Sequence, residues 1–197
     1  MKNFLLKIIF TIHVKFIRAW LSPVYYNILM LIKYRGEKPD VWDNIKDLNM
    51  EEFHKEIAIR EQFEYHRDPL NGFFDFSPRD KNFFFKEYIT SGRDCTAWAR
   101  VWKWYLKHHD IETKEIAMLN TDELFSDGLS AHMVTVGKFE DGWRLFDYRP
   151  SRQYEDSIDK VLEHNVVGYD EFIWTEYKDR CYITFFILII LTLLIYF

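Results

Sequence analysis

The chain has few cysteines, and this shortage already narrows what it can be. Its 197 residues include two cysteines, Cys95 and Cys181, and neither belongs to a pair separated by two residues. This spacing argues against a structural zinc site and against the disulfide framework of a small secreted domain. We therefore expect Cys95 to be a reduced thiol.

An excess of positive charge is lacking as well. The formal net charge is −5 at pH 7, whereas nucleic-acid-binding domains carry a basic patch or stripe. We therefore expect no nucleic-acid partner. Internal repeats and low-complexity tracts are also absent, and the length suits one domain with its own core rather than two full-sized ones.

The end of the chain is strongly apolar, since residues 181–197 contain no charge. As a helix they would span roughly 25 Å at about 1.5 Å per residue, the short end of what crosses a hydrocarbon core. Lys178 and Arg180 precede them, and the positive-inside bias would keep the preceding domain cytoplasmic. We interpret residues 179–197 as a C-terminal anchor, with a buried core helix or strand as the alternative. Cys181 is a candidate for lipidation.

The beginning of the chain predicts an amphipathic helix over residues 4–21. A wide apolar face surrounds a thin polar and basic stripe, made by Lys7, Thr11, Lys15 and Arg18. Such a helix lies in a membrane interface. Ser22 and Pro23 break it before another apolar run. We interpret residues 1–36 as membrane-associated, and the alternative is a helical hairpin packed on the rest of the chain. Both termini thus predict a membrane-associated protein whose soluble domain faces the cytoplasm.

Residues 37–178 have ordinary polarity and form one predicted domain. A first helix is expected within residues 47–65, capped by Asn49, and a second over residues 95–107. Ala99, Trp102 and Leu106 recur at helical spacing in the second helix and predict its core-facing stripe.

After the second helix the apolar period changes to two. Alternation predicts strands over residues 111–119, 131–139 and 143–148. Asp141 and Gly142 form a hairpin turn signal between the last two strands. Helices followed by an antiparallel sheet indicate an α+β fold.

Cys95 is the first residue of the second predicted helix. Backbone N–H groups at a helix start favour a thiolate, and they can also donate to an oxyanion. A cysteine nucleophile further needs a base and a group that orients the base. His132 opens one predicted strand and Asp147 lies near the end of the next. A hairpin turning at Asp141 and Gly142 pairs His132 with residue 151, so only a longer or bulged hairpin brings Asp147 closer.

Two stretches, "SGRDCTAWARVWKWYL" and "AHMVTVGKFEDGWRLFDYRP", resemble the core of the transglutaminase-like cysteine hydrolase superfamily, which has a papain-like fold. That family places a cysteine at a helix start, a histidine at the start of a strand and an aspartate on the next strand. Cys95 and His132 are 37 residues apart and His132 and Asp147 are 15 apart, spacings typical of that core. The resemblance covers about residues 60–155, including "YHRDPLNGFFDFSPRD".

The resemblance implies a nucleophile helix packed on an antiparallel sheet and a Cys95–His132–Asp147 triad. By the family's chemistry, Cys95 attacks a protein or peptide amide carbonyl and forms a thioester, His132 moves the proton, and Asp147 orients His132. Water as the acceptor gives hydrolysis, and an amine gives transamidation. Neither a cofactor nor a metal is implied.

The sequence departs from the family pattern beside the nucleophile. Many relatives have Gly-Asp-Cys followed by an acidic residue, whereas Arg93 intervenes here and Thr96 follows the cysteine. The departures leave open a catalytically inactive module that acts as a membrane-tethered binding protein. A cell-wall peptide hydrolase or an arylamine acetyltransferase is a further alternative, but the latter's Arg-Gly-Gly approach is missing. We expect residues 120–130 to form a loop over the site, and Asn82 is a candidate oxyanion-hole side chain.

Other conspicuous residues receive structural interpretations. Residues 108–110 (His-His-Asp) point in directions about 100° apart on a helix, so they mark a helix end rather than a metal site. Arg149 and Arg152 are read as a solvated loop, with binding of an acidic substrate group as the alternative. The tryptophans of the second helix are interpreted as packing residues: Trp98, Trp102 and Trp104.

Overall fold

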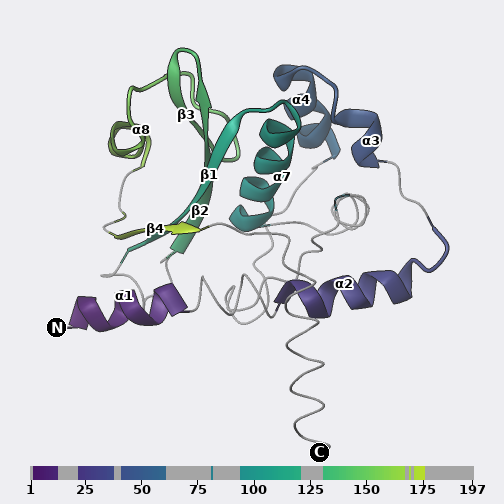
Figure 1. The fold of residues 1–197 in the computed structure, drawn as a ribbon, viewed down its shortest axis with the longest axis horizontal. Helices are drawn as coiled ribbons and strands as arrows, with labels where there is room; N and C mark the ends of the chain where they lie inside the picture. The colour runs from purple at the N-terminus through teal and green to yellow at the C-terminus, as the bar shows by residue number, and fades with distance from the viewer. Residues whose placement is uncertain are drawn as a thin grey trace, which may run out of the picture.

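The computed structural model describes residues 2–12, 22–37, 41–60, 81, 94–120, 131–166, 169 and 171–175. Figure 1 shows the helices and strands in chain order: α1 (Lys2–Ile12), α2 (Ser22–Lys33), α3 (Val41–Ile45), α4 (Met50–Arg60), α7 (Cys95–His108), β1 (Glu112–Leu119), β2 (Ala131–Phe139), β3 (Gly142–Phe146), α8 (Ile158–Asn165) and β4 (Glu171–Thr175).

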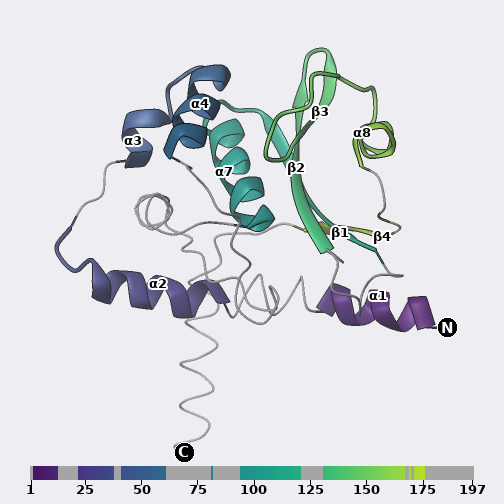
Figure 2. The same ribbon diagram turned by 180° about the vertical axis from the view of Figure 1, so that it is seen from behind.

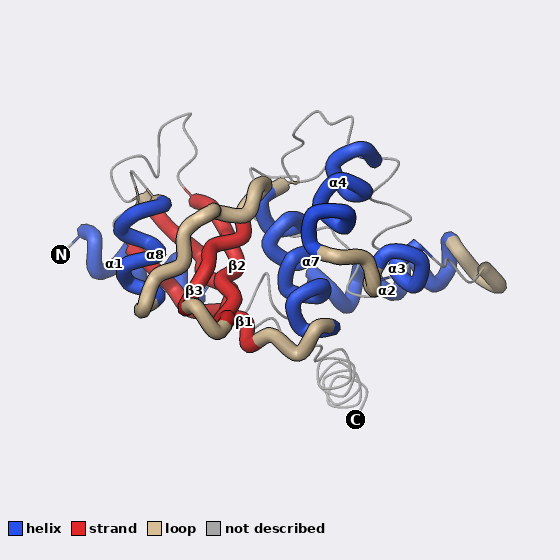
Figure 3. Tube along the Cα trace, turned by 90° about the horizontal axis from the view of Figure 1, so that it is seen from above, coloured by secondary structure: helices blue, strands red, loops and turns tan. Residues whose placement is uncertain are grey.

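The strands form one antiparallel sheet in the order β3-β2-β1-β4. Seen from above, the sheet lies between α8 on one side and α7 with α3 and α4 on the other (Figure 3). This arrangement confirms the predicted α+β class. Helix α8 and strand β4 follow the hairpin in the chain and were not predicted from the sequence. Both are short, eight and five residues long, so their apolar periodicity is weak.

The two faces of the sheet follow from the two-residue period of its strands. On β1, Ala117 and Leu119 belong to a buried cluster with α7. Ile116 and Met118 alternate with them and pack in a second cluster with Val161 of α8. Strands β1, β2 and β3 contribute buried residues to clusters on both faces of the sheet, which is therefore a middle layer of the described domain.

Helix α7 is buried on all sides. The predicted stripe of Ala99, Trp102 and Leu106 is fully buried, but so is every other residue from position 95 to 106. The sheet covers one face of the helix, and aromatic residues of α3 and α4 cover another, with Phe53 stacked on Tyr105 at 4.1 Å between ring centroids. The sequence predicted one buried face of α7. The helix is buried on more than one face because α3 and α4 pack against it on the side away from the sheet.

Local signals set the starts of the predicted helices. The Asn49 side chain accepts a hydrogen bond from the Glu52 backbone N–H at 3.0 Å, which confirms the predicted cap of α4. Helix α2 begins at Ser22 with Pro23 in its first turn, where a missing N–H costs nothing. The helix predicted within residues 47–65 corresponds to α4, and its last part, residues 61–65, lies outside the described residues.

The β2–β3 hairpin turns where the sequence predicts, but with a tighter register. Phe139 pairs with Gly142, and Gly142 has φ of 126°. A Cβ at Gly142 would stand 2.4 Å from the Glu155 carbonyl oxygen, so glycine is required on both counts. Thr135 consequently pairs with Phe146, two residues tighter than the predicted alignment.

The terminal segments are described only in part. Among the described residues, no helix is both long enough and apolar enough to cross a membrane. Helix α1 ends at Ile12, so residues 13–21 of the predicted amphipathic helix lie outside the described residues. The predicted anchor at residues 179–197, including Cys181, also lies outside them and stays a prediction.

Candidate active site

The structure brings His132 and Asp147 together at one end of the β2–β3 hairpin. His132 is the second residue of β2, and Asp147 directly follows the last residue of β3. Continuing the ladder places Val134 opposite Asp147, so the two side chains approach diagonally rather than across a longer or bulged hairpin. The His132 Nε2–H donates to Asp147 Oδ2 at 2.8 Å.

Asp147 is held by contacts to both its backbone and its carboxylate. Its carbonyl oxygen accepts a hydrogen bond from the Trp102 indole N–H at 2.8 Å. Its Oδ1 accepts from the Tyr148 backbone N–H at 2.8 Å, which leaves Oδ2 directed to His132. Trp102 was interpreted as a packing residue alone; it also ties Asp147 to α7, the helix that carries Cys95.

Cys95 begins α7 and lies on the other side of His132. Its side chain is 9% exposed and is a free thiol. Cys95 lies near enough to the His132 ring to contribute to raising the pKa of that ring. The three predicted site residues therefore lie together in one row.

The surroundings strongly favour a protonated His132. Burial lowers the pKa of this imidazole, but its hydrogen bonds with Asp147 and Cys95, together with their negative charges, outweigh burial and raise the pKa from 6.5 to about 10. His132 is therefore an imidazolium at neutral pH.

The start of α7 is only partly free to stabilise negative charge. Asp94 caps the helix, and its Oδ1 accepts from the backbone N–H groups of Thr96 and Ala97 at 3.0 and 3.2 Å. From the sequence, such N–H groups were predicted to stabilise the thiolate and to donate hydrogen bonds to an oxyanion. Because a carboxylate takes two of them, the N–H of Cys95 itself is the donor that remains for an oxyanion among the described residues.

Aromatic rings flank the row of three residues. Tyr169 stacks on the His132 ring at 6.1 Å between centroids. Tyr148, which is exposed, meets Trp98 edge-on at 4.8 Å, and the His54 Nε2–H donates to the Tyr148 carbonyl at 3.1 Å. Sequence reasoning missed these neighbours. Tyr148 directly follows Asp147 and could have been found, whereas His54 and Tyr169 carry no local signal.

Several other predicted residues lie away from this row. The rings of His108 and His109 bind separate partners, Asp47 at 2.7 Å and the Lys46 carbonyl at 3.0 Å. Arg149 and Arg152 are exposed, as a solvated loop requires. Asn82 and residues 121–130 of the predicted covering loop lie outside the described residues.

Comparison of the chain with protein-family models, with curated proteins and with solved structures gives no match. The geometry of the site and the chemistry of its side chains are therefore the basis for assigning a function.

Proposed function

We propose that this chain is a membrane-associated thiol enzyme of the transglutaminase-like type, which cleaves or transfers acyl groups at protein or peptide amide bonds. One observation carries the proposal. His132 stands between the Asp147 carboxylate, at 2.8 Å, and the Cys95 thiol, and its pKa is raised to about 10. The three residues come from a helix start, a strand start and a strand end. Packing of the hydrophobic core does not by itself explain why these three side chains lie together.

The arrangement supports a two-step acyl transfer. The Cys95 thiolate attacks the carbonyl carbon, and the resulting oxyanion accepts from the Cys95 backbone N–H. The imidazolium of His132 then gives its proton to the departing amine, which leaves a thioester on Cys95. Water or an amine attacks the thioester while neutral His132 takes the proton, and the thiolate is released. Asp147 holds the ring in one orientation throughout.

A second candidate function is a catalytically inactive, membrane-tethered binding module. Asp94 favours it, because this buried carboxylate occupies two N–H groups beside the nucleophile. Its negative charge also opposes a thiolate and an oxyanion at the same helix end.

The reactivity of Cys95 separates the two functions. Iodoacetamide should label the wild-type protein near neutral pH much faster than it labels glutathione. Labelling should be lost in Cys95→Ala and slowed in His132→Ala, whereas Cys181→Ala, which removes the other cysteine, is the matched control and should keep it. A Cys95 that reacts no faster than glutathione would contradict the enzyme and leave the binding module.

Membrane association is tested separately. Deleting residues 181–197 should release the protein from membranes or sharply weaken its attachment, as measured by fractionation and carbonate extraction. Unchanged fractionation would contradict the anchor without bearing on the chemistry of Cys95.

A further inference from the structure

Helix α1 exposes an apolar face that no described part of the chain covers. Its exposed large side chains fall at positions 4, 5, 8, 9 and 12, the spacing of one helical face, and Phe4 is 68% exposed. These residues are Phe4, Leu5, Ile8, Ile9 and Ile12. Surface area of this kind is unfavourable in water and marks an interaction site.

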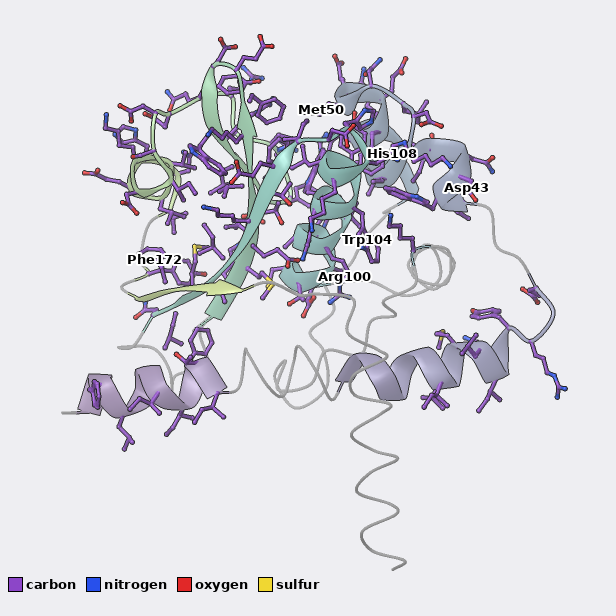
Figure 4. All side chains as sticks on the ribbon, viewed as in Figure 1. Asp43, Met50, Arg100, Trp104, His108 and Phe172 are labelled. Atoms are coloured by element: carbon purple, nitrogen blue, oxygen red, sulfur yellow. The ribbon has the colours of Figure 1, made fainter. Side chains whose placement is uncertain are left out.

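Helix α2 repeats the pattern on the same side of the molecule. Ile28, Leu29, Leu31 and Ile32 are exposed, whereas Met30 between them is 4% exposed. Both helices lie along the same edge of the fold, α1 toward one end and α2 toward the other (Figures 1 and 2). Figure 4 shows that some side chains of each helix point away from the sheet and from α7, where Arg100 and Trp104 are labelled. The exposed apolar residues of the two helices are here called together the α1–α2 surface.

Charge indicates what covers this surface. The first acidic residue of the chain is Glu37, although the whole chain has a net charge of −5. The preceding basic residues are Lys2, Lys7, Lys15, Arg18, Lys33 and Arg35. A broad apolar face within a purely basic segment suits an anionic lipid bilayer, since acyl chains take the apolar face and head groups take the basic side chains.

The same helix reaches the nucleophile. Phe10 is 9% exposed and, among the described side chains of α1, is the large apolar one that is buried. It belongs to the hydrophobic cluster that holds Cys95, and the remaining members are Ala99, Ala117, Leu119 and Met133. Apolar side chains from α1, α7 and two strands therefore meet beside Cys95, an environment that suits an acyl chain.

We propose that the acyl group taken by Cys95 is a long fatty acyl chain drawn from the membrane, and that it occupies the place of Phe10 in this cluster. The proposal rests on the proposed function for its nucleophile and goes beyond it in the substrate, which is a fatty acyl compound rather than a peptide amide. The Cys95 thiolate bonds to the acyl carbon, and the bond from that carbon to the leaving oxygen, sulfur or nitrogen breaks. His132 protonates the leaving group. Water then hydrolyses the thioester, and a fatty acid is released.

Chain-length preference tests this assignment. Full-length protein on vesicles of phosphatidylcholine and phosphatidylglycerol would be given coumarin esters with four-carbon and sixteen-carbon acyl chains. The longer ester should react at least about tenfold faster, because each methylene buried beside Cys95 adds to binding. Phe10→Ala and the milder Phe10→Leu should shift the preference. Val161→Ala, a buried truncation on the opposite face of the sheet, is the matched control and should leave the preference unchanged.

Two further substrates distinguish the sources of the chain. Release of labelled fatty acid from the phospholipid itself would identify a lipid ester, and release from an acylated peptide would identify a modified protein. Either result supports the proposal. The proposal would be overturned if the two esters react at equal rates and if Phe10→Ala and Phe10→Leu do not change these rates, even when Cys95 is reactive. A wild-type Cys95 that reacts with iodoacetamide no faster than glutathione does would instead overturn the proposed function.

Discussion

Helix α7 and helix α1 invert the usual relation between composition and burial. Helix α7 carries Arg100 and Lys103, yet both are buried. Seven of the eleven residues of α1 are apolar, yet most of its described large side chains are exposed. Charged groups tolerate burial when they are paired, whereas exposed apolar groups gain stability only from a partner. The comparison teaches that the described part of the chain buries α7 but leaves an apolar face of α1 uncovered.

The polar contacts of α7 make this difference concrete. Lys103 forms an ion pair with Glu115 of β1, and the Ala99 carbonyl accepts from the Thr135 hydroxyl at 2.6 Å. Together with the bond from Trp102 to Asp147, these contacts tie α7 to the sheet. Changes to α7 and its partners should therefore alter chemistry or folding, whereas changes to the α1–α2 surface should alter membrane binding.

The largest expected effect concerns the acid of the triad. Asp147→Asn removes the negative charge that orients His132 and stabilises its protonated form. Acyl transfer should therefore fall on the order of 10³- to 10⁴-fold, and the His132 pKa should drop toward its ordinary value of 6.5. Steady-state rates and NMR titration of the ring measure the two effects. Full activity in Asp147→Asn would remove Asp147 from the mechanism.

The second effect concerns folding. Lys103→Met leaves Glu115 charged and buried, with its side chain 1% exposed, and should lower the free energy of unfolding by about 3–5 kcal/mol. Lys55→Met is the matched control, because the Lys55–Glu51 pair is exposed, and little change is expected there. Urea denaturation of both variants measures the difference, and equal losses would show that burial of the α7 pair is unimportant.

The third effect belongs to the α1–α2 surface. Ile9→Asp places a negative charge in the exposed apolar face, where Ile9 is 55% exposed. Partition onto anionic vesicles should fall by about tenfold to 100-fold, while the free energy of unfolding should hardly change. Vesicle sedimentation and denaturation check the two halves. A variant that unfolds instead would show that α1 is part of the core.

The smallest effect is a gradual dependence on pH. The folded His132 pKa of about 10 lies above the ordinary 6.5, so the stability this group contributes is complete below pH 6.5 and is lost as pH rises through about 10. Acyl transfer should fall about tenfold between pH 9 and 11, because His132 can no longer protonate the leaving group. Iodoacetamide labelling needs no such proton and should not fall. A parallel decline of both would point to unfolding.

The sequence predicted what short-range patterns determine. Alternation located β2 over its full length, and the hairpin signal located the turn at Gly142. The cap at Asn49 was also a local signal. The capping role of Asp94 was equally local, since aspartate is a preferred N-cap residue, but it was not predicted.

Other features depend on contacts between distant residues. No local pattern shows that the Trp102 indole meets the Asp147 carbonyl, 45 positions away. The bridge between Trp143 and Glu155, which brings the later chain over Gly142, also has no local signal. The placement of Phe10 near Cys95 likewise depends on the whole fold, since the two residues are 85 positions apart in the sequence.

The bond between Trp102 and Asp147 has a consequence for the order of events during folding. Cys95 and Trp102 share a helix that forms early from local interactions, but Asp147 reaches them only when the hairpin has docked. Until then Cys95 is separated from His132, although His132 already has Asp147 on its own hairpin. In the proposed enzyme, the nucleophile therefore meets its base only in the completed fold.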